Sequence, residues 1–339
     1  MECVGSTLYV MDRGIPAVHK IDIPPAIGQA WSLGTILAAS IPETGTVHRT
    51  LLLQTTRGPY ALRCYRYADR ARIAREHALI AFAHAHSLPV PAPCPLSNGA
   101  TILEQDGHYY ALFPHASGRH IRRADLGRDE IEVMATFLGT MHGALQRYPV
   151  ERVEARSFAA DLTTTLARIE RIERVIRARP EPSEIDRIAL VRLAGRRHWL
   201  LRGPSTAVPS LANLPVQVIH GDYQETNLFF AAGKVSAVID WDQAYAAPRA
   251  WEVMRVLHLV CAFALAPSQT FLRAYRTVQS LPLDDLRRAA ACYCSLRTHD
   301  LWVYEATYLE GNERARAFIQ PGTFVPLEER WARLQAALL

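Results

Sequence analysis

Short runs in which apolar residues alternate with polar ones fill the first third of the chain, and they predict strands. Three of them, Ile36 to Ile41, Thr50 to Thr55 and Tyr60 to Tyr65, are separated by polar turns and favour an antiparallel meander. Two further strands are predicted at Thr101 to Glu104 and Tyr109 to Phe113. The pattern therefore predicts a mainly antiparallel sheet in this part of the chain.

A helical period occurs once among these strands and then dominates the rest of the chain. Among the strands, Arg70 to His86 repeats apolar residues at helical spacing. The segment from Pro114 to Gly118 breaks the last strand, and we interpret it as a hinge. Beyond it the pattern predicts helices at 129–148, 158–179, 184–201, 248–266 and 284–311.

The change of period suggests a division of the chain. Residues 1–30 show no clear period and are interpreted as an N-terminal extension. Residues 31–116 are expected to form a small lobe, the N-lobe, and residues 117–339 a mainly helical C-lobe. The expected fold class is therefore α+β, with two lobes.

A hairpin in the C-lobe carries the most regularly placed polar residues. Leu228 to Phe230 and Val235 to Ile239 are apolar runs suited to strands, with a turn expected about Gly233-Lys234. Folded there, the hairpin would bring Asn227 and Asp240 opposite each other. An amide oxygen and a carboxylate are hard ligands that suit Mg²⁺ better than a soft metal.

Asp222 precedes Asn227 by the five-residue interval that separates base and metal ligand in the catalytic loop of kinases. A carboxylate there can accept the proton of an attacking hydroxyl, while a metal held by Asn227 and Asp240 neutralises charge on phosphate groups. Each residue alone is better explained as a turn or cap residue. The three together, in this order, predict phosphoryl transfer.

Composition excludes some classes of protein. Of the 339 residues, 49% are hydrophobic and 21% charged, as in ordinary globular proteins. The net charge of +5 is mild and dispersed, so neither nucleic acid nor a membrane is an expected partner. The six cysteines show neither a C-x-x-C pair nor a framework spacing, and we see no secretory signal or spanning segment. The expected location is cytoplasmic.

Three residues of the N-lobe are candidate nucleotide contacts. Arg63 lies in the third strand, where its guanidinium could hold two phosphate oxygens, and Glu76 of the following helix could pair with it. Gly45, in the turn from Thr44 to Thr46, permits close approach of backbone N–H groups to phosphate oxygens. The alternatives are solvated residues at Arg63 and Glu76 and an ordinary β-turn at Gly45.

The last predicted helix carries Arg297, Asp300 and Tyr304 at intervals of three and four residues. Such a face could form the wall of an acceptor pocket, and aromatic rings beside a carboxylate favour a cationic or amino-alcohol acceptor. The alternative is a helix packed through its tyrosines. Asp242, two residues after Asp240, is a further candidate acceptor contact.

With these residues in place, the chain resembles the aminoglycoside phosphotransferase and homoserine kinase-like family, a branch of the protein kinase-like fold. The resemblance covers roughly residues 40 to 310. It is carried by His220-Gly221-Asp222 with Asn227, and by Val238-Ile239-Asp240-Trp241-Asp242; Tyr60-Ala61-Leu62-Arg63 and Leu138-Gly139-Thr140-Met141-His142 support it.

The resemblance implies a bilobal fold, with an N-lobe antiparallel sheet and one helix, a mainly helical C-lobe that binds the acceptor, and ATP and Mg²⁺ as cofactors. The hinge at Phe113 to His115 would hold adenine by backbone groups. Asp222 would be the catalytic base, and Asn227 and Asp240 would bind Mg²⁺. The family's phosphate-contacting lysine is replaced here by Arg63, which keeps the charge.

The expected activity is transfer of the ATP γ-phosphate to a hydroxyl of an amino alcohol, amino acid, sugar or aminoglycoside-like antibiotic. One alternative is a bacterial protein Ser/Thr kinase of the stress-response type. Another is a nucleotide-binding pseudokinase, for which Arg63 is the argument, although Asp222, Asn227 and Asp240 together speak against it. The sequence leaves the identity of the acceptor and the oligomeric state open.

Overall fold

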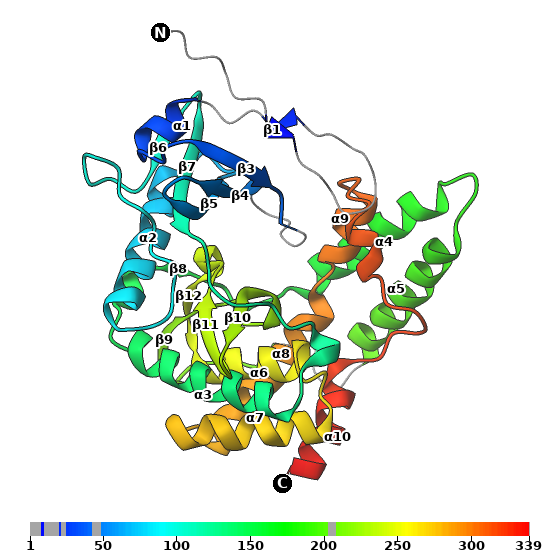
Figure 1. The fold of residues 1–339 in the computed structure, drawn as a ribbon. Coiled ribbons are helices and arrows are strands. Elements are labelled where there is room, and N and C mark those ends of the chain that lie inside the picture. The colour runs from blue at the N-terminus through cyan, green and yellow to red at the C-terminus, as the bar shows by residue number, and fades with distance from the viewer. Residues whose placement is uncertain (1–7, 10–19, 22–24, 43–48, 203–207, 339) are drawn as a thin grey trace. The chain divides into compact units, whose positions relative to one another are not determined.

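The computed structural model of the chain describes residues 8–9, 20–21, 25–42, 49–202 and 208–338. It separates into two compact units, whose elements Figure 1 traces. Unit 1 comprises residues 1–154 and 217–246, and unit 2 comprises residues 155–216 and 247–339. The lobe boundaries expected near residues 30 and 116 stay predictions.

Unit 1 contains a five-stranded antiparallel sheet with the strand order β3-β4-β5-β7-β6. The predicted meander is confirmed, and each strand end lies within two residues of its expected position. In this register Arg63 lies between Thr50 of one neighbouring strand and Ala111 of the other. The strands are β3 (Ile36–Ser40), β4 (Arg49–Thr55), β5 (Gly58–Cys64), β6 (Leu103–Gln105) and β7 (His108–Pro114).

The helix α2 (Arg70–Ala85) accompanies this sheet, as its period predicts. The Asp69 carboxylate caps it by accepting a hydrogen bond of 2.9 Å from the backbone N–H of Arg72. Its buried face carries Glu76 and His77 among aliphatic residues. Polar side chains on a buried face need partners, because burial without a hydrogen bond is costly. These two residues therefore belong to the description of the site.

A short helix, α1 (Pro25–Ala30), lies in the stretch expected to be an extension without structure. Its Ile27 is fully buried and joins the sheet core with Leu33, Leu53 and Leu112. Six residues are too few for a helical period to show, so the sequence pattern could not reveal this helix.

The second hairpin of unit 1 consists of β10 (Leu228–Ala231) and β11 (Lys234–Val238). Its turn is Ala232-Gly233, one residue earlier than expected, and both residues have positive φ, 48° and 69°. Two successive positive values give the type I′ turn that matches the twist of a hairpin.

The earlier turn and a bulge between Phe229 and Phe230 change the register at the open end of this hairpin. The backbone N–H of Ile239 donates to the carbonyl of Asn227 at 3.0 Å. Asn227 therefore faces Ile239, and the expectation that it lies directly opposite Asp240 is wrong by one residue.

The long helix α3 (Arg128–Leu145) completes unit 1 and confirms the predicted helix at 129–148. Its buried face contains Met134, Leu138 and Met141, each with no exposed surface. Short strands lie near the unit boundaries or the N-terminus: β8 (Glu154–Ala155), β9 (Val216–Ile219) and β12 (Tyr245–Pro248), and β1 (Leu8–Tyr9) paired with β2 (Lys20–Ile21).

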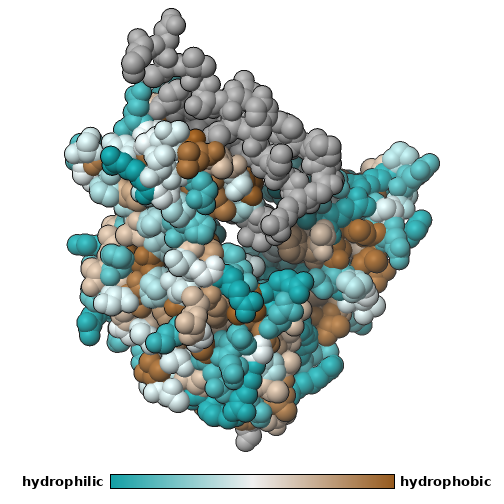
Figure 2. Space-filling model, viewed as in Figure 1, coloured by the Kyte–Doolittle hydropathy of each residue, from teal (hydrophilic) through white to brown (hydrophobic). Residues whose placement is uncertain are grey.

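Unit 2 is mainly helical in its described residues, and α4, α5 and α9 (Figure 1) share one apolar core. Figure 2 shows hydrophilic and hydrophobic residues interspersed over the visible face. None of the helices in the described ranges is long and apolar enough to cross a membrane. The helices are α4 (Leu162–Arg177), α5 (Glu184–Arg202), α6 (Arg249–Leu259), α7 (Leu265–Val278), α8 (Leu283–His299), α9 (Trp302–Tyr308) and α10 (Leu327–Leu338).

Two predicted helices of unit 2 are wrong at their ends. The helix expected at 248–266 stops at Leu259, and Pro267, expected to be a break, is the third residue of α7. Proline is tolerated in a first turn, where its missing N–H has no intrahelical partner. The helix expected at 284–311 is interrupted after His299, so that Asp300 is the C-cap of α8.

Candidate active site

A glycine that no other residue can replace sets the position of the predicted base. Gly221 has φ of +82°, and a Cβ at this position would collide with the carbonyl of Gln243 and approach the ring of Tyr245 to 2.8 Å. Only glycine combines this backbone with so little space. Asp222 follows directly, so its position depends on this close approach.

His220 links the same loop to Ile239, the residue that follows β11. Its Nε2 lies 2.9 Å from the carbonyl of Ile239, and the backbone N–H of Asp222 lies 3.3 Å from its Nδ1. Because a carbonyl only accepts and a backbone N–H only donates, the proton is on Nε2 and the ring is neutral. His220 is fully buried, and its ring meets Trp241 edge-on. We conclude that His220 orients the loop.

The Asp222 carboxylate is held by two side-chain amides. Its Oδ2 accepts hydrogen bonds from Asn227 Nδ2 at 2.9 Å and from Gln224 Nε2 at 3.0 Å. Asn227 Nδ2 also donates to the Asp222 carbonyl at 2.8 Å. The amide oxygen of Asn227 lies on the opposite edge of the amide group and therefore points away from Asp222. Gln224 was missed by the sequence analysis, and its position two residues after Asp222 is the signal that could have found it.

Two contacts outside the loop keep it in place. The Tyr223 hydroxyl donates to the carbonyl of Met134 in α3 at 2.8 Å. Arg123 forms an ion pair of 3.0 Å with Glu225, which is buried. Together with His220 on the other side, these contacts anchor the loop before and after Asp222, as a group that must meet a reacting atom requires.

Asp240, the other predicted metal ligand, has a left-handed backbone with φ of 67° and ψ of 60°. It precedes the 3₁₀ turn η4 (Trp241–Gln243). Aspartate tolerates this conformation better than most residues, but the conformation still costs free energy, and such positions cluster at functional sites. The strained backbone at Asp240 therefore agrees with a functional role for its carboxylate.

Arg63 reaches both Glu76 and Asp240. Its Nη1 lies 3.0 Å from Glu76 Oε1, and its Nη2 lies 3.4 Å from Asp240 Oδ1. The rings of Tyr65 and Phe113 lie 5.9 and 5.6 Å from its Cζ. The order of elements in the sequence correctly brings Arg63 and Glu76 together. The contact to Asp240 adds a link from the sheet to the end of the catalytic hairpin.

Burial and charge act in opposite directions on this pair. Burial lowers the pKa of Arg63, but Glu76, Tyr65 and Asp240 raise it, so the pKa is raised overall and the guanidinium stays charged. The pKa of Glu76 is raised to about 7. Burial is the largest cause, the charges of Asp242 and Asp240 act in the same direction, and Arg63 acts against them. Glu76 is therefore a carboxyl group that titrates near neutral pH.

A chain of hydrogen bonds continues from Glu76 into the sheet core. Tyr65 hydrogen-bonds Glu76, and the Tyr65 hydroxyl lies 3.0 Å from His77 Nε2. His77 Nδ1 lies 2.7 Å from Thr101 Oγ1. Burial, reinforced by the charge of Arg63, lowers the pKa of His77 to about 4, so the ring is neutral at neutral pH. Both ring nitrogens of His77 thus have partners, whereas Glu76 Oε2 is buried and has no hydrogen-bond partner among the described residues.

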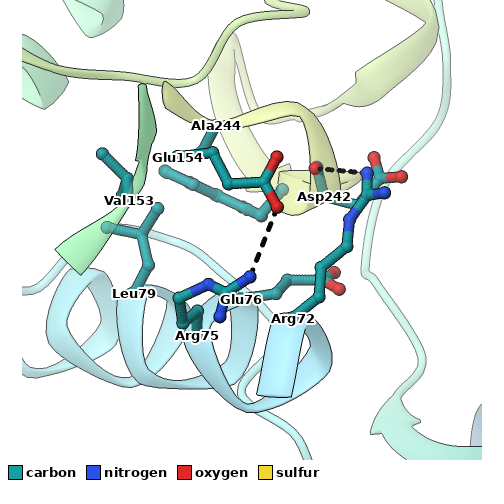
Figure 3. Close-up of a pocket in the computed structure, with 9 residues that line it drawn as sticks. Arg72, Arg75, Glu76, Leu79, Val153, Glu154, Asp242 and Ala244 are labelled. Carbon is teal, nitrogen blue, oxygen red and sulfur yellow. Dashed lines mark hydrogen bonds and ion pairs between the residues drawn. The ribbon is translucent and has the colours of Figure 1, made fainter. Parts of the chain in front are cut away.

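A small cavity of about 30 Å³ is lined by Glu76 and neighbouring residues of α2 and by the turn that contains Asp242 (Figure 3). In Figure 3, side chains of α2 face the turn that contains Asp242. Arg72 donates to the Asp242 carbonyl at 3.4 Å, and Arg75 pairs with Glu154 at 3.3 Å. A volume of this size holds about one water and no nucleotide or acceptor. Asp242, a candidate acceptor contact, lies here beside α2.

The other predicted nucleotide contacts have mixed outcomes. Gly45 and its turn lie outside the described residues. Phe113 pairs with Ala61 inside the sheet. The backbone N–H of His115 donates to the carbonyl of Pro59 at 3.3 Å. An adenine held at this point would therefore have to compete with Pro59 for that N–H group.

Beyond the predicted hinge, the chain is fastened to the catalytic hairpin. Arg119 and Phe230 exchange two backbone hydrogen bonds of 3.0 and 2.9 Å. The Ser236 hydroxyl donates to the Ser117 carbonyl at 2.6 Å, and a Cβ on Gly118 would lie 2.7 Å from the carbonyl oxygen of Phe230. This segment therefore packs against the strands that position Asn227.

The remaining candidate acceptor contacts belong to unit 2. Arg297 forms an ion pair with Asp300 at the end of α8. Tyr304 is 4% exposed, and its hydroxyl accepts a hydrogen bond of 3.3 Å from Arg192 Nε. Tyr304 thus packs in the helical core. The face predicted from helical spacing is divided between two helices.

Comparison with known proteins gives the family of this chain. The sequence model of the Phosphotransferase enzyme family matches residues 39–292, which include the whole arrangement around Asp222, Asn227 and Asp240. The chain belongs to the phosphotransferase enzyme family. The family resemblance drawn from the sequence motifs is therefore confirmed.

Curated relatives of this phosphotransferase include two kinds of kinase. A homoserine kinase of Agrobacterium fabrum is 24% identical over 265 residues, which cover 76% of each chain. A stress response kinase A of Salmonella paratyphi A is 22% identical over 220 residues, covering 63% of this chain and 60% of that protein.

Solved structures similar to this phosphotransferase confirm the protein kinase-like fold. An aminoglycoside phosphotransferase from Alicyclobacillus acidocaldarius superposes with a TM-score of 0.63 at 14% identity, covering 95% of this chain and 97% of that chain. A spectinomycin phosphotransferase, crystallised with ADP and spectinomycin, gives 0.60 at 14% identity with 92% of each chain covered.

Proposed function

We propose that this phosphotransferase moves the γ-phosphoryl group of ATP to a hydroxyl of a small molecule, with Asp222 as the base. The observation that carries the proposal is the pair of side-chain amides on the Asp222 carboxylate, which both donate to its Oδ2. These hydrogen bonds from Asn227 and Gln224 fix the orientation of the carboxylate. A carboxylate held in position is what general-base catalysis requires.

In this proposal, Asp222 accepts the proton of the attacking hydroxyl as the oxygen–phosphorus bond forms. Asn227 holds the base through its amide nitrogen. Arg63 stabilises phosphate charge, and Glu76 keeps its guanidinium at the sheet. Most of the rate enhancement then comes from positioning and fixed charge.

The residues present fit a divalent cation with hard ligands. The amide oxygen of Asn227 is turned away from Asp222, and the Asp240 carboxylate is partly exposed, at 31%. Among the described residues, no group of three or more His, Cys, Asp or Glu could hold a metal ion, so phosphates and water would complete the shell. This is the typical environment of Mg²⁺, which neutralises charge on the phosphates when bound.

The test is acceptor-stimulated formation of ADP from Mg·ATP. The panel contains L-homoserine, 3-amino-1-propanol, choline, an aminoglycoside, a macrolide, a sugar and a generic protein, with Asp222→Asn as the blank. A signal that a small molecule stimulates and the blank lacks supports the proposal. Stimulation by the protein alone would support a protein kinase, the activity named for the Salmonella relatives. Silence of the whole panel would favour the pseudokinase.

A further inference from the structure

A groove of about 380 Å³ lies in unit 2, where α10 packs against both α7 and α8 (Figure 1). Every residue that lines it belongs to unit 2, and none is among the residues around Asp222 or Arg63. Its volume falls within the range of small-molecule sites, about 300–1,000 Å³. The chemistry of its lining decides which molecule it suits.

The helix α7 presents a mixed stripe of residues to this groove. The stripe consists of Gln269, Leu272, Arg273 and Arg276, at intervals of three, one and three residues. Residues at such intervals lie on one face of a helix. The same face of α7 therefore carries both apolar and basic side chains to the groove.

The other two helices contribute mainly apolar residues. Leu283 and Leu286 of α8 are three residues apart. On α10, Trp331, Gln335 and Leu338 follow one another at intervals of four and three. Each of these helices therefore also turns a single face to the groove.

The floor of the groove is formed by its most buried apolar side chains. Leu272, Leu286 and Trp331 are 4%, 1% and 7% exposed, whereas Leu283 and Leu338 are half-buried at its sides. Water above an apolar floor has few polar partners there, so its displacement by an aliphatic chain is favourable.

Arg273 and Arg276 form a basic edge on this groove, because both are exposed and lie about one turn apart on α7. Arg276 Nε donates to the carbonyl of Leu281 at 3.4 Å, which leaves its two Nη groups for a ligand. Arg273 makes no hydrogen bond or ion pair to the described residues. Two guanidinium groups of this kind attract an anion.

Two carboxylates limit the charge of that anion. Asp284 and Asp285 lie in the first turn of α8, beside Leu283. Neither forms an ion pair with the two arginines, but at longer range their charges offset those of the basic edge. A ligand with one negative charge is therefore favoured over a dianion such as a phosphate monoester.

The extent of the groove argues against a protein as its occupant. Nine residues line it. A stable protein interface takes about 20–30 residues from each partner. The groove is therefore better suited to a small molecule that has an apolar part and one anionic group.

We propose that this groove binds a monocarboxylate with an aliphatic chain, the chemical class of a fatty acid. The carboxylate accepts hydrogen bonds from Arg273 and Arg276, and the chain lies on the floor formed by Leu272, Leu286 and Trp331. The proposal concerns binding within unit 2 and does not rest on the proposed function.

The experiment compares octanoate with three ligands that each change one property. In calorimetry of the full chain, butanoate shortens the aliphatic chain, 1-octanol removes the charge and octylammonium reverses it. Octanoate should bind about tenfold tighter than 1-octanol, through charge-assisted hydrogen bonds. Each methylene between butanoate and octanoate should tighten binding by up to about fourfold. Octylammonium should bind more weakly than 1-octanol, because the arginines repel it.

Variants locate the site. Arg273→Gln combined with Arg276→Gln should make octanoate and 1-octanol bind equally while keeping the dependence on chain length. Both arginines are exposed, so this variant should stay folded. Arg287→Gln changes an exposed arginine of α8 outside the lining; as the matched control it should bind octanoate as wild type does. Gln335→Trp, which fills the groove from α10, should abolish octanoate binding.

No binding of octanoate, equal affinities for octanoate and octylammonium, or unchanged octanoate binding in the double variant would each overturn the proposal. An equal loss in Arg287→Gln would overturn it in favour of attraction to a basic surface. Tighter binding of octyl phosphate than of octanoate would contradict the single charge. A dimer that Gln335→Trp separates, without octanoate binding, would make a second copy the occupant. The measurements need no ATP, so their outcome is separate from the test of phosphoryl transfer.

Discussion

Arg63 in unit 1 and Arg196 in unit 2 are both buried, but their charges are matched in opposite ways. Arg63 is paired with the carboxylates of Glu76 and Asp240, and its pKa is raised overall. Arg196 is bonded to three carbonyls, and burial, with the nearby Arg297 and Arg192, lowers its pKa.

The difference shows what each guanidinium does in its unit. A phosphate that approaches Arg63 must compete with Asp240, whose contact of 3.4 Å is the longer of the two. Arg196 forms no ion pair among the described residues, although the charges of Asp300 and Glu328 act on it, and its hydrogen bonds go to the carbonyls at the end of α8. A guanidinium paired with carboxylates therefore organises a site, whereas one bonded to carbonyls holds the end of a helix.

The largest effect should come from replacing the base, Asp222. This variant tests whether the chemical step depends on unit 1 alone. Asp222→Asn should lower kcat by about a hundredfold to ten-thousandfold, because a neutral amide cannot accept the proton. Nucleotide binding and binding of octanoate in unit 2 should stay close to wild type, as calorimetry would show. A simultaneous loss of octanoate binding would break the division between the two units.

Removal of Glu76, the closer of the two carboxylates that pair with Arg63, should have the next largest effect. Glu76→Ala leaves a buried guanidinium with the distant contact to Asp240 and should lower the free energy of unfolding by about 3–5 kcal/mol in denaturant titrations. Glu154→Ala, which breaks an exposed pair beside the same cavity, is the control and should cost less than about 1 kcal/mol.

The exchanged pair sharpens this test. Arg63→Glu combined with Glu76→Arg should recover part of the stability that each single change removes. If the double variant restores nothing, and Glu76→Ala binds nucleotide as tightly as wild type, the pair has no part in holding the nucleotide.

The buried network beside Arg63 predicts a dependence of stability on pH. Unfolded histidine takes up a proton near pH 6.5, but folded His77 does so only near pH 4. The unfolded state binds more protons between these values, so stability falls as pH falls, by about 3 kcal/mol at pH 4. His77→Gln should remove this contribution, so that the opposite contribution of Glu76, a stability that rises as pH falls, becomes visible in unfolding experiments between pH 7 and 4.

Glu76 acts with the opposite sign over nearly the same pH range, so the two contributions to stability largely cancel in the wild type. Its pKa is raised from the usual 4.5 to about 7, so its contribution to stability is present below pH 4.5 and is lost as pH rises through 7. Glu76→Gln should remove this rise in acid while keeping the His77 slope. Equal slopes in both variants and in wild type would show that neither group is perturbed by burial.

The smallest expected effect concerns the metal ligand. Asp240→Asn should weaken Mg²⁺-dependent nucleotide binding about tenfold, because a neutral oxygen replaces a charged one. Titrations of nucleotide with and without Mg²⁺ measure the difference. Parent-like affinity for Mg·ATP in this variant would contradict the assignment of Asp240.

The sequence predicted the parts of the fold that depend on local pattern. The strands of the meander alternate apolar and polar residues, and α2 and α3 repeat them at helical spacing, so their ends were found within three residues. The interruption at Asp300 was not predictable from spacing. It depends on Arg196, more than a hundred residues earlier, which holds the carbonyls at the end of α8.

The candidate site shows the same limit. The spacing of Asp222, Asn227 and Asp240 and the pairing of Arg63 with Glu76 follow from order along the chain. The exact facing of Asn227 does not, because the turn lies one residue earlier than expected and the bulge makes up only part of the resulting shift in register. The burial of Arg196 was also beyond sequence reasoning, since on a helix rich in arginine nothing local separates a buried guanidinium from a solvated one.

Position 63, where the family resemblance implies a lysine, carries an arginine, and this has a consequence for detection. A nucleotide that carries an acylating group on its phosphates marks kinases by reacting with a neutral amine. The guanidinium of Arg63 is held in its protonated form and is not such a nucleophile. The lysines of the whole chain are Lys20, in β2, and Lys234, which begins β11 at the exposed turn. A survey of cell extracts with such reagents would therefore pass over this enzyme even where it is abundant and active.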